Sequence, residues 1–273
     1  MPELPEVETV RITLLPLLMN KKIVSVQLLY DKMIVNNTPE SFTSRLVGQT
    51  FRGIERRGKY LIFILSNLKM ISHLRMEGKY YLKDESIPIE KHEHVIFTLD
   101  TGESLRYHDT RKFGTMELLE FNQISQTGFS SLGFEPFDDE FSWIYLKEKL
   151  AHSNRPIKGG LLDQSVISGL GNIYVDEVLY SSKIHPARLC SSIRDDEFKK
   201  IAENSKVILE KAINLGGASV HSFSYGDGIT GRFQNELNVH THADEPCNEC
   251  GYVIEKMKVA GRTTYYCPNC QRM

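Results

Sequence analysis

The chain has 273 residues, of which 41% are hydrophobic and 25% are charged, and its formal net charge is −2. This length suits about two domains and can bury a substantial core. No run of apolar residues is long enough to predict a membrane-spanning helix. The slightly acidic balance argues weakly against a nucleic-acid-binding protein, although a local basic cluster such as residues 52–59 can override the sum. The N-terminus lacks the layout of a signal peptide, so we expect a cytosolic protein.

The N-terminal stretch begins Met1-Pro-Glu-Leu-Pro-Glu-Val-Glu-Thr-Val. Removal of Met1 would leave Pro2 with a free secondary amine, and an α-amino group titrates near pH ~8. Its neutral form can attack an electrophilic carbon to form an iminium, as activated lysine amines do. Glu3 follows directly as a possible proton carrier. The alternative is structural, because proline and glutamate also favour the first turn of a helix. Apolar residues at three- and four-residue spacing predict that helix over residues 5–18, with Pro16 ending or kinking its last turn.

Short segments rich in β-branched and aromatic residues follow between residues 22 and 119. They predict strands at residues 23–27, 60–65, 70–75, 78–83, 95–99 and 104–107, with a hairpin turn at residues 100–103. Several short strands separated by turns indicate a β-sandwich or a flattened barrel, and the pattern alone does not choose between the two.

From about residue 140 the periodicity becomes helical, and it predicts helices at residues 141–150, 173–182 and 195–214. Ser168-Gly-Leu-Gly-Asn172 leads into the second of these helices. Glycines before a helix let the backbone approach a ligand, and a helix N-terminus attracts phosphate. The glycine-rich residues 218–235 predict a mobile loop.

Four of the five cysteines are paired by spacing, as Cys247-x2-Cys250 and Cys267-x2-Cys270. This pattern predicts a tetrahedral zinc site. Four thiolates leave no open coordination position, so the zinc would be structural rather than catalytic. Disulfides are the alternative, but cytosolic thiols stay reduced. Cys190 has no partner by spacing.

The chain resembles the bacterial formamidopyrimidine-DNA glycosylase family in several segments. These include the opening stretch, the basic segment Arg56-Arg-Gly-Lys-Tyr60 and the glycine-rich helix start. The resemblance runs from end to end. It implies that Pro2 attacks C1′ of a damaged nucleotide and that Glu3 assists. Lys59 would help with the sugar–phosphate chemistry. Arg262, in Val259-Ala-Gly-Arg262 between the two cysteine pairs, would contact phosphates and act in the last elimination.

The resemblance also implies a set of DNA-binding residues. Met76, Arg111 and Phe113 would fill the gap left by an extruded base, with Arg111 hydrogen-bonding the orphaned cytosine. Phosphate contacts would come from His73, His92, Arg155, Lys158 and Asn172. A metal site at His92 and His94 is the alternative for that pair, without an evident third ligand. The sequence departs from the family at Val239-His-Thr-His242, where relatives commonly have Tyr-Gly followed by a basic residue.

We therefore expect a multidomain α+β protein. An N-terminal helix and β-sandwich would occupy residues 1–133, a helix–two-turn–helix domain residues 134–236 and a zinc finger residues 237–273. The resemblance implies a monomeric bifunctional glycosylase and AP lyase that acts on oxidised purines in duplex DNA, with one structural zinc ion and no membrane. Its place would be the bacterial cytoplasm, in association with the nucleoid. The alternatives are an endonuclease VIII-like specificity for oxidised pyrimidines and a zinc-ribbon DNA-binding protein without catalysis.

Overall fold

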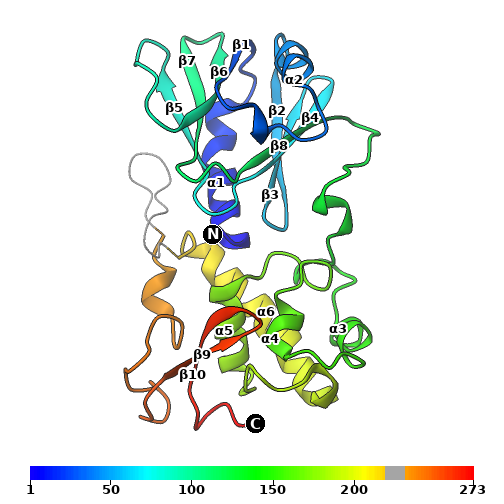
Figure 1. Ribbon diagram of the computed structural model, residues 1–273, viewed down its shortest axis with the longest axis vertical. Helices are drawn as coiled ribbons and strands as arrows, with labels where there is room; N and C mark the ends of the chain where they lie inside the picture. Colours follow the sequence, from blue (N-terminus) through cyan, green and yellow to red (C-terminus); the bar gives the residue numbers. More distant parts are fainter. Residues whose placement is uncertain (219–230) are drawn as a thin grey trace. The chain divides into compact units, whose positions relative to one another are not determined.

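The computed structural model describes residues 1–218 and 231–273 (Figure 1). Their contacts divide the chain into two compact units, which are taken separately below. The first is built from residues 1–130, and the second from residues 131–218 and 232–273. The second unit contains both the helices and the four-cysteine ribbon. Most of the loop predicted at residues 218–235 lies outside the described residues.

Helix α1 (Leu4–Leu18) opens the first unit. Val7, Val10 and Leu14 are buried on one stripe, as the three- and four-residue spacing predicted. The same spacing predicted Leu17 as the next buried residue, but Leu17 is 42% exposed and Leu18 is buried instead. The helix begins where the Glu6 carboxylate accepts a hydrogen bond from the Glu3 backbone N–H at 2.8 Å, which satisfies one of the unpaired donors at a helix start. Pro16 lies in the last turn, and the helix ends two residues later, as expected from the missing proline N–H.

Two four-stranded antiparallel sheets form the rest of this unit, with strand orders β1-β6-β7-β5 and β2-β3-β4-β8. The strands are β1 (Ile23–Leu28), β2 (Phe51–Arg57), β3 (Tyr60–Leu65), β4 (Leu68–His73), β5 (Lys79–Asp84), β6 (Glu93–Leu99), β7 (Glu103–His108) and β8 (Thr115–Glu120). The turn predicted at residues 100–103 joins the paired strands β6 and β7. The predicted β-sandwich is confirmed.

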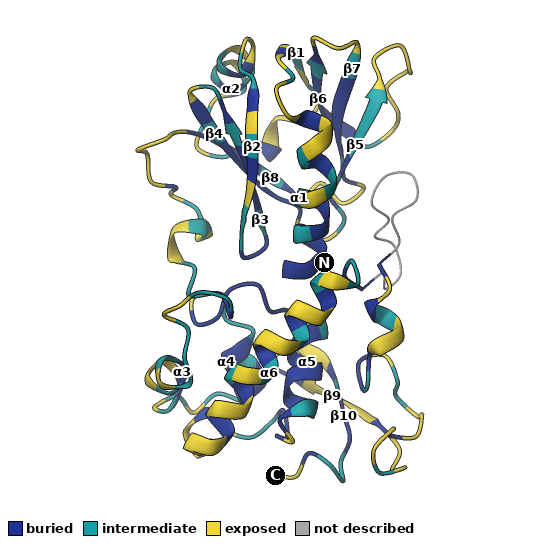
Figure 2. Cartoon of the chain, turned by 180° about the vertical axis from the view of Figure 1, so that it is seen from behind, coloured by how far each residue is buried: buried dark blue, intermediate teal, exposed yellow. Residues whose placement is uncertain are grey.

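One hydrophobic core joins α1 and the two sheets. It takes Phe97 and Leu105 from one sheet and Phe63 and Leu118 from the other, each inaccessible to solvent. Figure 2 shows the buried positions running along the strands. Burial of a large apolar side chain contributes roughly 1.5–3 kcal/mol, so this core holds α1 and the N-terminus it carries in a fixed place.

Three elements of the first unit have no counterpart among the predicted ones. Helix α2 (Pro39–Leu46) is short and buries only Phe42 and Leu46, so its periodic signal is brief. Strand β2 contains the basic cluster around Arg56, and only two of its residues, Phe51 and Ile54, are buried. Its sequence therefore shows little of the apolar pattern that predicts a strand. Strand β8 lies in a mixed segment that forms a strand by pairing with β4. The 3₁₀ turns η1 (Asp31–Met33) and η2 (Gly128–Ser131) complete the unit.

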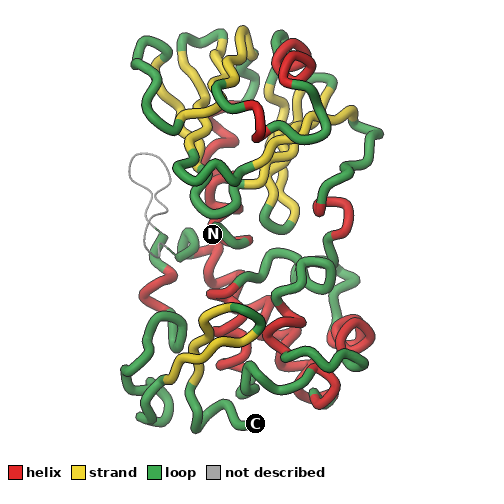
Figure 3. Tube along the Cα trace, viewed as in Figure 1, coloured by secondary structure: helices red, strands yellow, loops and turns green. Residues whose placement is uncertain are grey.

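The second unit begins with four helices, drawn in red like the other helices in Figure 3. They are α3 (Trp143–Leu150), α4 (Ile157–Leu161), α5 (Asn172–Ser181) and α6 (Asp195–Asn214). Helices α3 and α5 both pack on α6. The three predicted helices are confirmed, and α4 is a single turn, too short for a periodic signal. Two 3₁₀ turns, η3 (Cys190–Ser192) and η4 (Phe233–Glu236), lie among the connections.

The unit ends in a two-stranded antiparallel ribbon, β9 (Glu255–Val259) and β10 (Arg262–Tyr266). Val259 pairs with Arg262, so Ala260 and Gly261 form a two-residue turn. Both have positive φ, 50° and 72°, which matches a type I′ hairpin turn and explains the glycine. Strand β10 packs on α5. No helix among the described residues is long and apolar enough to cross a membrane.

Candidate active site and nucleic-acid interface

Pro2 and Glu3 are buried at the start of α1, and Glu3 is only 3% exposed. Ion pairs also hold helix α1 in place. Glu8 on α1 binds Arg11 and also Arg56 on β2, with a distance of 2.9 Å between Arg56 Nε and Glu8 Oε2. Burial alone would raise the pKa of Glu8, but its two arginine partners outweigh burial and lower that pKa. The first turn of α1 is therefore fixed by packing, capping and charge, as a reacting terminus requires.

Lys59 lies in the tight turn between β2 and β3, where Arg57 pairs with Tyr60. Gly58 precedes it with a φ of 56°, a conformation that glycine adopts without strain. Lys59 is 4% exposed, which is rare for a lysine in a turn. A lysine beside a turn is usually exposed to solvent, so the burial of Lys59 sets it apart from an ordinary surface lysine.

His73, at the end of β4, is also buried. Its Nδ1 accepts a hydrogen bond from the Arg75 backbone N–H at 2.9 Å, and its ring packs edge-on against Tyr60 at 4.3 Å. Burial lowers the pKa of His73 to about 3, and the charges of Arg75 and Lys59 add to the effect. His73 is therefore neutral at cellular pH and offers a phosphate an N–H from Nε2 but no charge.

Met76, Arg111 and Phe113, the residues expected to fill a gap in the duplex, come from two neighbouring loops. Met76 follows β4 and is 40% exposed, while Phe113 follows β7 and is 52% exposed. The Thr110 hydroxyl donates a hydrogen bond to Glu77 and so joins the two loops. The Arg111 guanidinium lies 4.8 Å from the centre of the Phe113 ring. Exposed apolar side chains beside a cation suit insertion between bases.

The sequence reasoning missed the residue that shapes this second loop. Asp109 is inaccessible to solvent, and its carboxylate accepts three backbone N–H groups, from Arg111 at 2.9 Å, Phe113 at 2.9 Å and Gly114 at 2.8 Å. An aspartate that precedes a turn is a signal for this type of local bond. The segment Asp109-Thr-Arg-Lys-Phe-Gly114 has this signal, but the sequence prediction considered only Arg111 and Phe113 in it.

His92 is half-buried and has a φ of 74°. Its ring contacts those of His94, at 6.3 Å, and His108, at 5.8 Å. The alternative of a metal site has no support among the described residues, because the only group of three or more potential ligands found there is the four cysteines. Burial lowers the pKa of His108, and the neighbouring His92 and Lys79 contribute.

In the second unit, Asn172 is the first residue of α5, directly after the glycine-rich turn. Gly169 has a φ of 98°, and the Gln164 side chain holds the turn by accepting from the Gly169 N–H and donating to the Leu170 carbonyl. The sequence reasoning missed Gln164, which carries no motif of its own. The Asn172 Nδ2 donates to the Thr263 carbonyl at 3.0 Å and has a second N–H to offer a phosphate.

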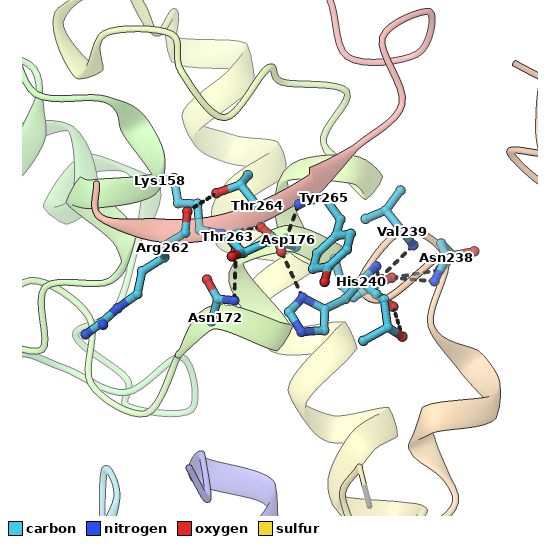
Figure 4. Close-up of polar contacts among 12 residues, drawn as sticks. Lys158, Asn172, Asp176, Asn238, Val239, His240, Arg262, Thr263, Thr264 and Tyr265 are labelled. Atoms are coloured by element: carbon cyan, nitrogen blue, oxygen red, sulfur yellow. Dashed lines mark hydrogen bonds and ion pairs between the residues drawn. The ribbon is translucent and has the colours of Figure 1, made fainter. Parts of the chain in front are cut away.

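Arg155 and Lys158 differ from the expected pair of phosphate ligands. Arg155 is partly exposed and pairs with Asp163 at 2.8 Å, a contact that a phosphate would have to share. Lys158 is 0% exposed, and its ammonium donates to Asp176 at 2.6 Å and to the Thr263 carbonyl at 3.3 Å (Figure 4). The sequence prediction placed Lys158 on a phosphate-binding face. In the structure its charge lies in the interior, because the carboxylate that neutralises it is there.

Arg262 is exposed at the first position of β10, beside the hairpin turn. Figure 4 shows its side chain extending away from the buried group around Asp176. A long cationic side chain displayed at a hairpin tip is well placed to contact a nucleic-acid backbone.

The four cysteines bring their sulfur atoms within 4.8 Å of one another. Cys247 Sγ and Cys270 Sγ are 3.9 Å apart, and Cys250 Sγ and Cys267 Sγ are 3.4 Å apart. Both distances exceed a disulfide bond of about 2 Å. A tetrahedron with zinc–sulfur bonds of about 2.3 Å has edges of roughly 3.8 Å. The geometry therefore fits a four-thiolate zinc ion, and the tyrosine hydroxyl of Tyr180 lies 3.2 Å from Cys247 Sγ.

An anchored N-terminal helix on a β-sandwich, a glycine-rich helix start and a four-cysteine ribbon together define a DNA glycosylase of the helix–two-turn–helix class. Three family models match the chain. The formamidopyrimidine-DNA glycosylase N-terminal domain matches residues 1–116, the H2TH domain of the same glycosylase matches residues 132–224, and the zinc finger found in FPG and IleRS matches residues 244–272.

Whole-length relatives agree with these models. The formamidopyrimidine-DNA glycosylase of Lactobacillus johnsonii is 48% identical over 99% of both chains, and that of Listeria monocytogenes is 44% identical over 100% of both. The structure of a mutant Lactococcus lactis FPG in complex with a Fapy-dG containing DNA superposes with a TM-score of 0.94, at 43% identity over 100% of both chains. MutM in complex with carbocyclic 8-oxo-G containing DNA gives 0.92, also at 43% identity and full coverage. The chain belongs to the formamidopyrimidine-DNA glycosylase family.

Proposed function

We propose that this protein is a bifunctional DNA glycosylase and AP lyase that excises 8-oxoguanine and formamidopyrimidines from duplex DNA. The observation that carries the proposal is the Pro2-Glu3 start of α1, buried and capped by Glu6, in a chain that matches its relatives from end to end. The solved relatives named above hold Fapy-dG and 8-oxo-G DNA, which favours oxidised purines over the oxidised pyrimidines of the endonuclease VIII branch.

The first step is attack by the Pro2 nitrogen. Its lone pair forms a bond to C1′ while the glycosidic bond breaks. The damaged base leaves with the electron pair of the glycosidic bond and takes up the proton that the Pro2 nitrogen releases. Glu3 holds and delivers a proton at the ring oxygen O4′, so that the sugar opens and an iminium forms between Pro2 and C1′. A secondary amine gives a charged iminium without losing a further proton, and this cation acidifies the C2′–H bond.

Elimination then follows in two steps. Loss of the C2′ proton expels the 3′ phosphate, and a second proton loss at C4′ expels the 5′ phosphate. Hydrolysis of the iminium returns the free amine. Lys59, whose ammonium belongs to a nearly buried turn, and Arg262 would stabilise the negative charge of the phosphates. Met76, Arg111 and Phe113 would occupy the duplex where the base has left.

Phosphate binding is assigned to Arg262, Asn172, Arg155 and His92, with His73 contributing an uncharged N–H. The zinc ion holds the ribbon that displays Arg262, since structural zinc in small fingers contributes on the order of 10 kcal/mol to folding. The protein would act as a monomer in the bacterial cytoplasm, in association with the nucleoid.

Borohydride trapping tests the proposal. The protein is mixed with duplexes that contain 8-oxoguanine, a formamidopyrimidine or an oxidised pyrimidine, reduced, digested and mapped by mass spectrometry. We expect a cross-link on Pro2 with both purine lesions. A matched variant, Lys59→Met, should still form the cross-link although it completes the eliminations slowly. A cross-link confined to the pyrimidine lesion supports the endonuclease VIII alternative, and no cross-link with any duplex supports a binding protein without catalysis.

A further inference from the structure

The segment before the ribbon, where the sequence departs from its relatives, contains a histidine with a defined partner. His240 Nδ1 lies 2.8 Å from Asp176 Oδ2, and both side chains are buried. A carboxylate can only accept, so Nδ1 must carry the hydrogen, which fixes the imidazole as a donor at that atom. The ring packs edge-on against Tyr265 of β10 at 4.9 Å. His240 therefore contacts α5 through a hydrogen bond and the ribbon through its ring.

Asp176 gathers three donors from three different parts of the unit (Figure 4). Its Oδ1 accepts from the Lys158 ammonium of α4 at 2.6 Å. Its Oδ2 accepts from His240 and, at 3.3 Å, from the Tyr265 backbone N–H in β10. The next residue of α5, Glu177, accepts from the backbone N–H groups of Asn238, Val239 and His240. Two consecutive carboxylates of α5 thus hold the pre-ribbon segment and the ribbon against one helix.

This arrangement sets the distance between two groups that are assigned to phosphates. The Thr263 carbonyl, next to Arg262, accepts both from the Lys158 ammonium and from Asn172 Nδ2 at the start of α5. The ribbon tip is therefore fastened to the helix start through Thr263, and to the middle of the helix through Tyr265. A buried charge with hydrogen-bonded partners resists displacement, because leaving one of them unpaired is costly.

We propose that Asp176 and His240 are positioning residues that fix the ribbon tip, and with it Arg262, relative to Asn172. Lys158 belongs to the same group and acts through its buried ammonium rather than by touching DNA. This inference rests on the proposed function, because it requires Arg262 and Asn172 to bind the phosphates around the lesion. It assigns to His240 an indirect part in DNA affinity, exerted through the position of Arg262.

Two substitutions separate positioning from packing. His240→Leu keeps the volume and removes the donor, whereas His240→Asn loses ring volume but places an N–H close to the position of Nδ1. Loss of a hydrogen-bonded contact to a charged group such as a phosphate weakens binding roughly 10- to 100-fold. If His240→Leu displaces Arg262, the dissociation constant for lesion duplex should rise by about that factor. His240→Asn should recover most of that loss. The rate of borohydride trapping at saturating DNA should stay near wild type in both, since Pro2 is untouched.

A double variant shows which group His240 acts through. In an Arg262→Gln background, His240→Leu should add little to the loss of affinity, because residues that act as a unit are not additive. The control is Glu197→Gln, which breaks a buried ion pair with Arg188 in the same unit and should leave the affinity unchanged. Zinc content and the thermal midpoint are measured for every variant.

The proposal is overturned if His240→Leu binds as tightly as wild type, if His240→Asn is no better than His240→Leu, or if the two losses in the double variant simply add. Should the Leu variant fail to fold, nitrogen NMR of the wild-type imidazole decides the matter, since a hydrogen on Nε2 alone contradicts the assigned bond to Asp176. A wild-type protein that does not trap lesion DNA refutes the proposed function instead, and that outcome is read before any variant is compared.

Discussion

Asp109→Asn should impair the choice of the base opposite the lesion, although Asp109 itself is buried and touches no DNA. Its carboxylate holds the loop of Arg111 and Phe113 through three backbone N–H groups. Asparagine has the same shape but only one accepting oxygen. In its better orientation that oxygen keeps Phe113 and Gly114, while the amide nitrogen opposes the Arg111 N–H. The loop then loses the bond that fixes the backbone of Arg111.

The magnitude follows from the bonds that are lost. A hydrogen bond to a charged group contributes about 1.5–3 kcal/mol, so one lost bond and one donor facing another donor should lower the free energy of unfolding by about 2–3 kcal/mol. A bidentate arginine contact to a base is worth about 1–3 kcal/mol of discrimination. A loosened Arg111 should lose much of this, so the ratio of rates opposite C and opposite A should fall roughly tenfold.

The assay measures single-turnover excision of 8-oxoguanine opposite C and opposite A, for wild type, Asp109→Asn, Arg111→Ala and the double variant. Wild type should be faster opposite C. Asp100→Asn is the matched control and should keep the wild-type ratio, because Asp100 accepts only one exposed backbone N–H, from Lys22, and the asparagine oxygen can still accept it. If Asp109→Asn lowers the ratio further in the Arg111→Ala background, Asp109 does not act through Arg111 and the reasoning is refuted.

Four further outcomes are expected. Protein that retains Met1 should give little cross-link, because the Pro2 nitrogen is then a planar amide. If a preparation shown by intact mass to keep Met1 cross-links fully, the nucleophile is another amine, and Lys59 is the first candidate. Cys247→Ala should abolish zinc binding and lesion-DNA affinity while circular dichroism still reports a folded β-sandwich, and retained affinity without zinc would contradict the role of the ribbon. Binding should weaken steeply with salt, and Arg262→Gln should reduce the slope of log affinity against log salt by about one. An unchanged slope would show that Arg262 does not contact a phosphate. The folded-state pKa of His73 is depressed to about 3, so the unfolded chain takes up the proton first as the pH falls. The contribution of His73 to the free energy of unfolding is complete above about pH 6.5 and should fall by about 2 kcal/mol by pH 5. His73→Gln should therefore flatten the fall in urea midpoint between pH 7 and pH 5, and equal slopes for the two proteins would contradict a buried neutral imidazole.

Local patterns in the sequence were sufficient for most elements of the fold. The stripe of Val7, Val10 and Leu14 predicts α1, and the acidic start with its periodic apolar residues predicts the bounds of α6 as observed. The paired cysteines predict the zinc site, because ligand type and spacing are set within a few residues. Strand β2 was missed because its two buried residues, Phe51 and Ile54, are three positions apart and do not show the two-residue period of a strand. Its pairing with β3 decides its conformation.

Short sequence motifs predicted the reacting and DNA-binding residues. The burial, partners and charge of these residues, however, depend on neighbours far along the chain. Lys158 illustrates this. Its sequence context predicts a phosphate ligand, and only the folded unit brings Asp176 from α5 and Thr263 from β10 around its ammonium. His73 is a second example, since burial beside Tyr60 removes the charge that a surface histidine would acquire at low pH.

The sequence by itself determined the class of most elements and the four-cysteine zinc motif, because each depends on chemistry carried by a few adjacent residues. Pro2 as the nucleophile stays a prediction from the opening motif. Tertiary structure alone decided which charges are buried, which carboxylates collect donors and which loops are fixed. Asp109, Gln164, Asp176 and His240 acquire their parts in this way. Burial and pairing are properties of segments brought together in space, and the cost of an unpaired buried polar group makes those arrangements specific.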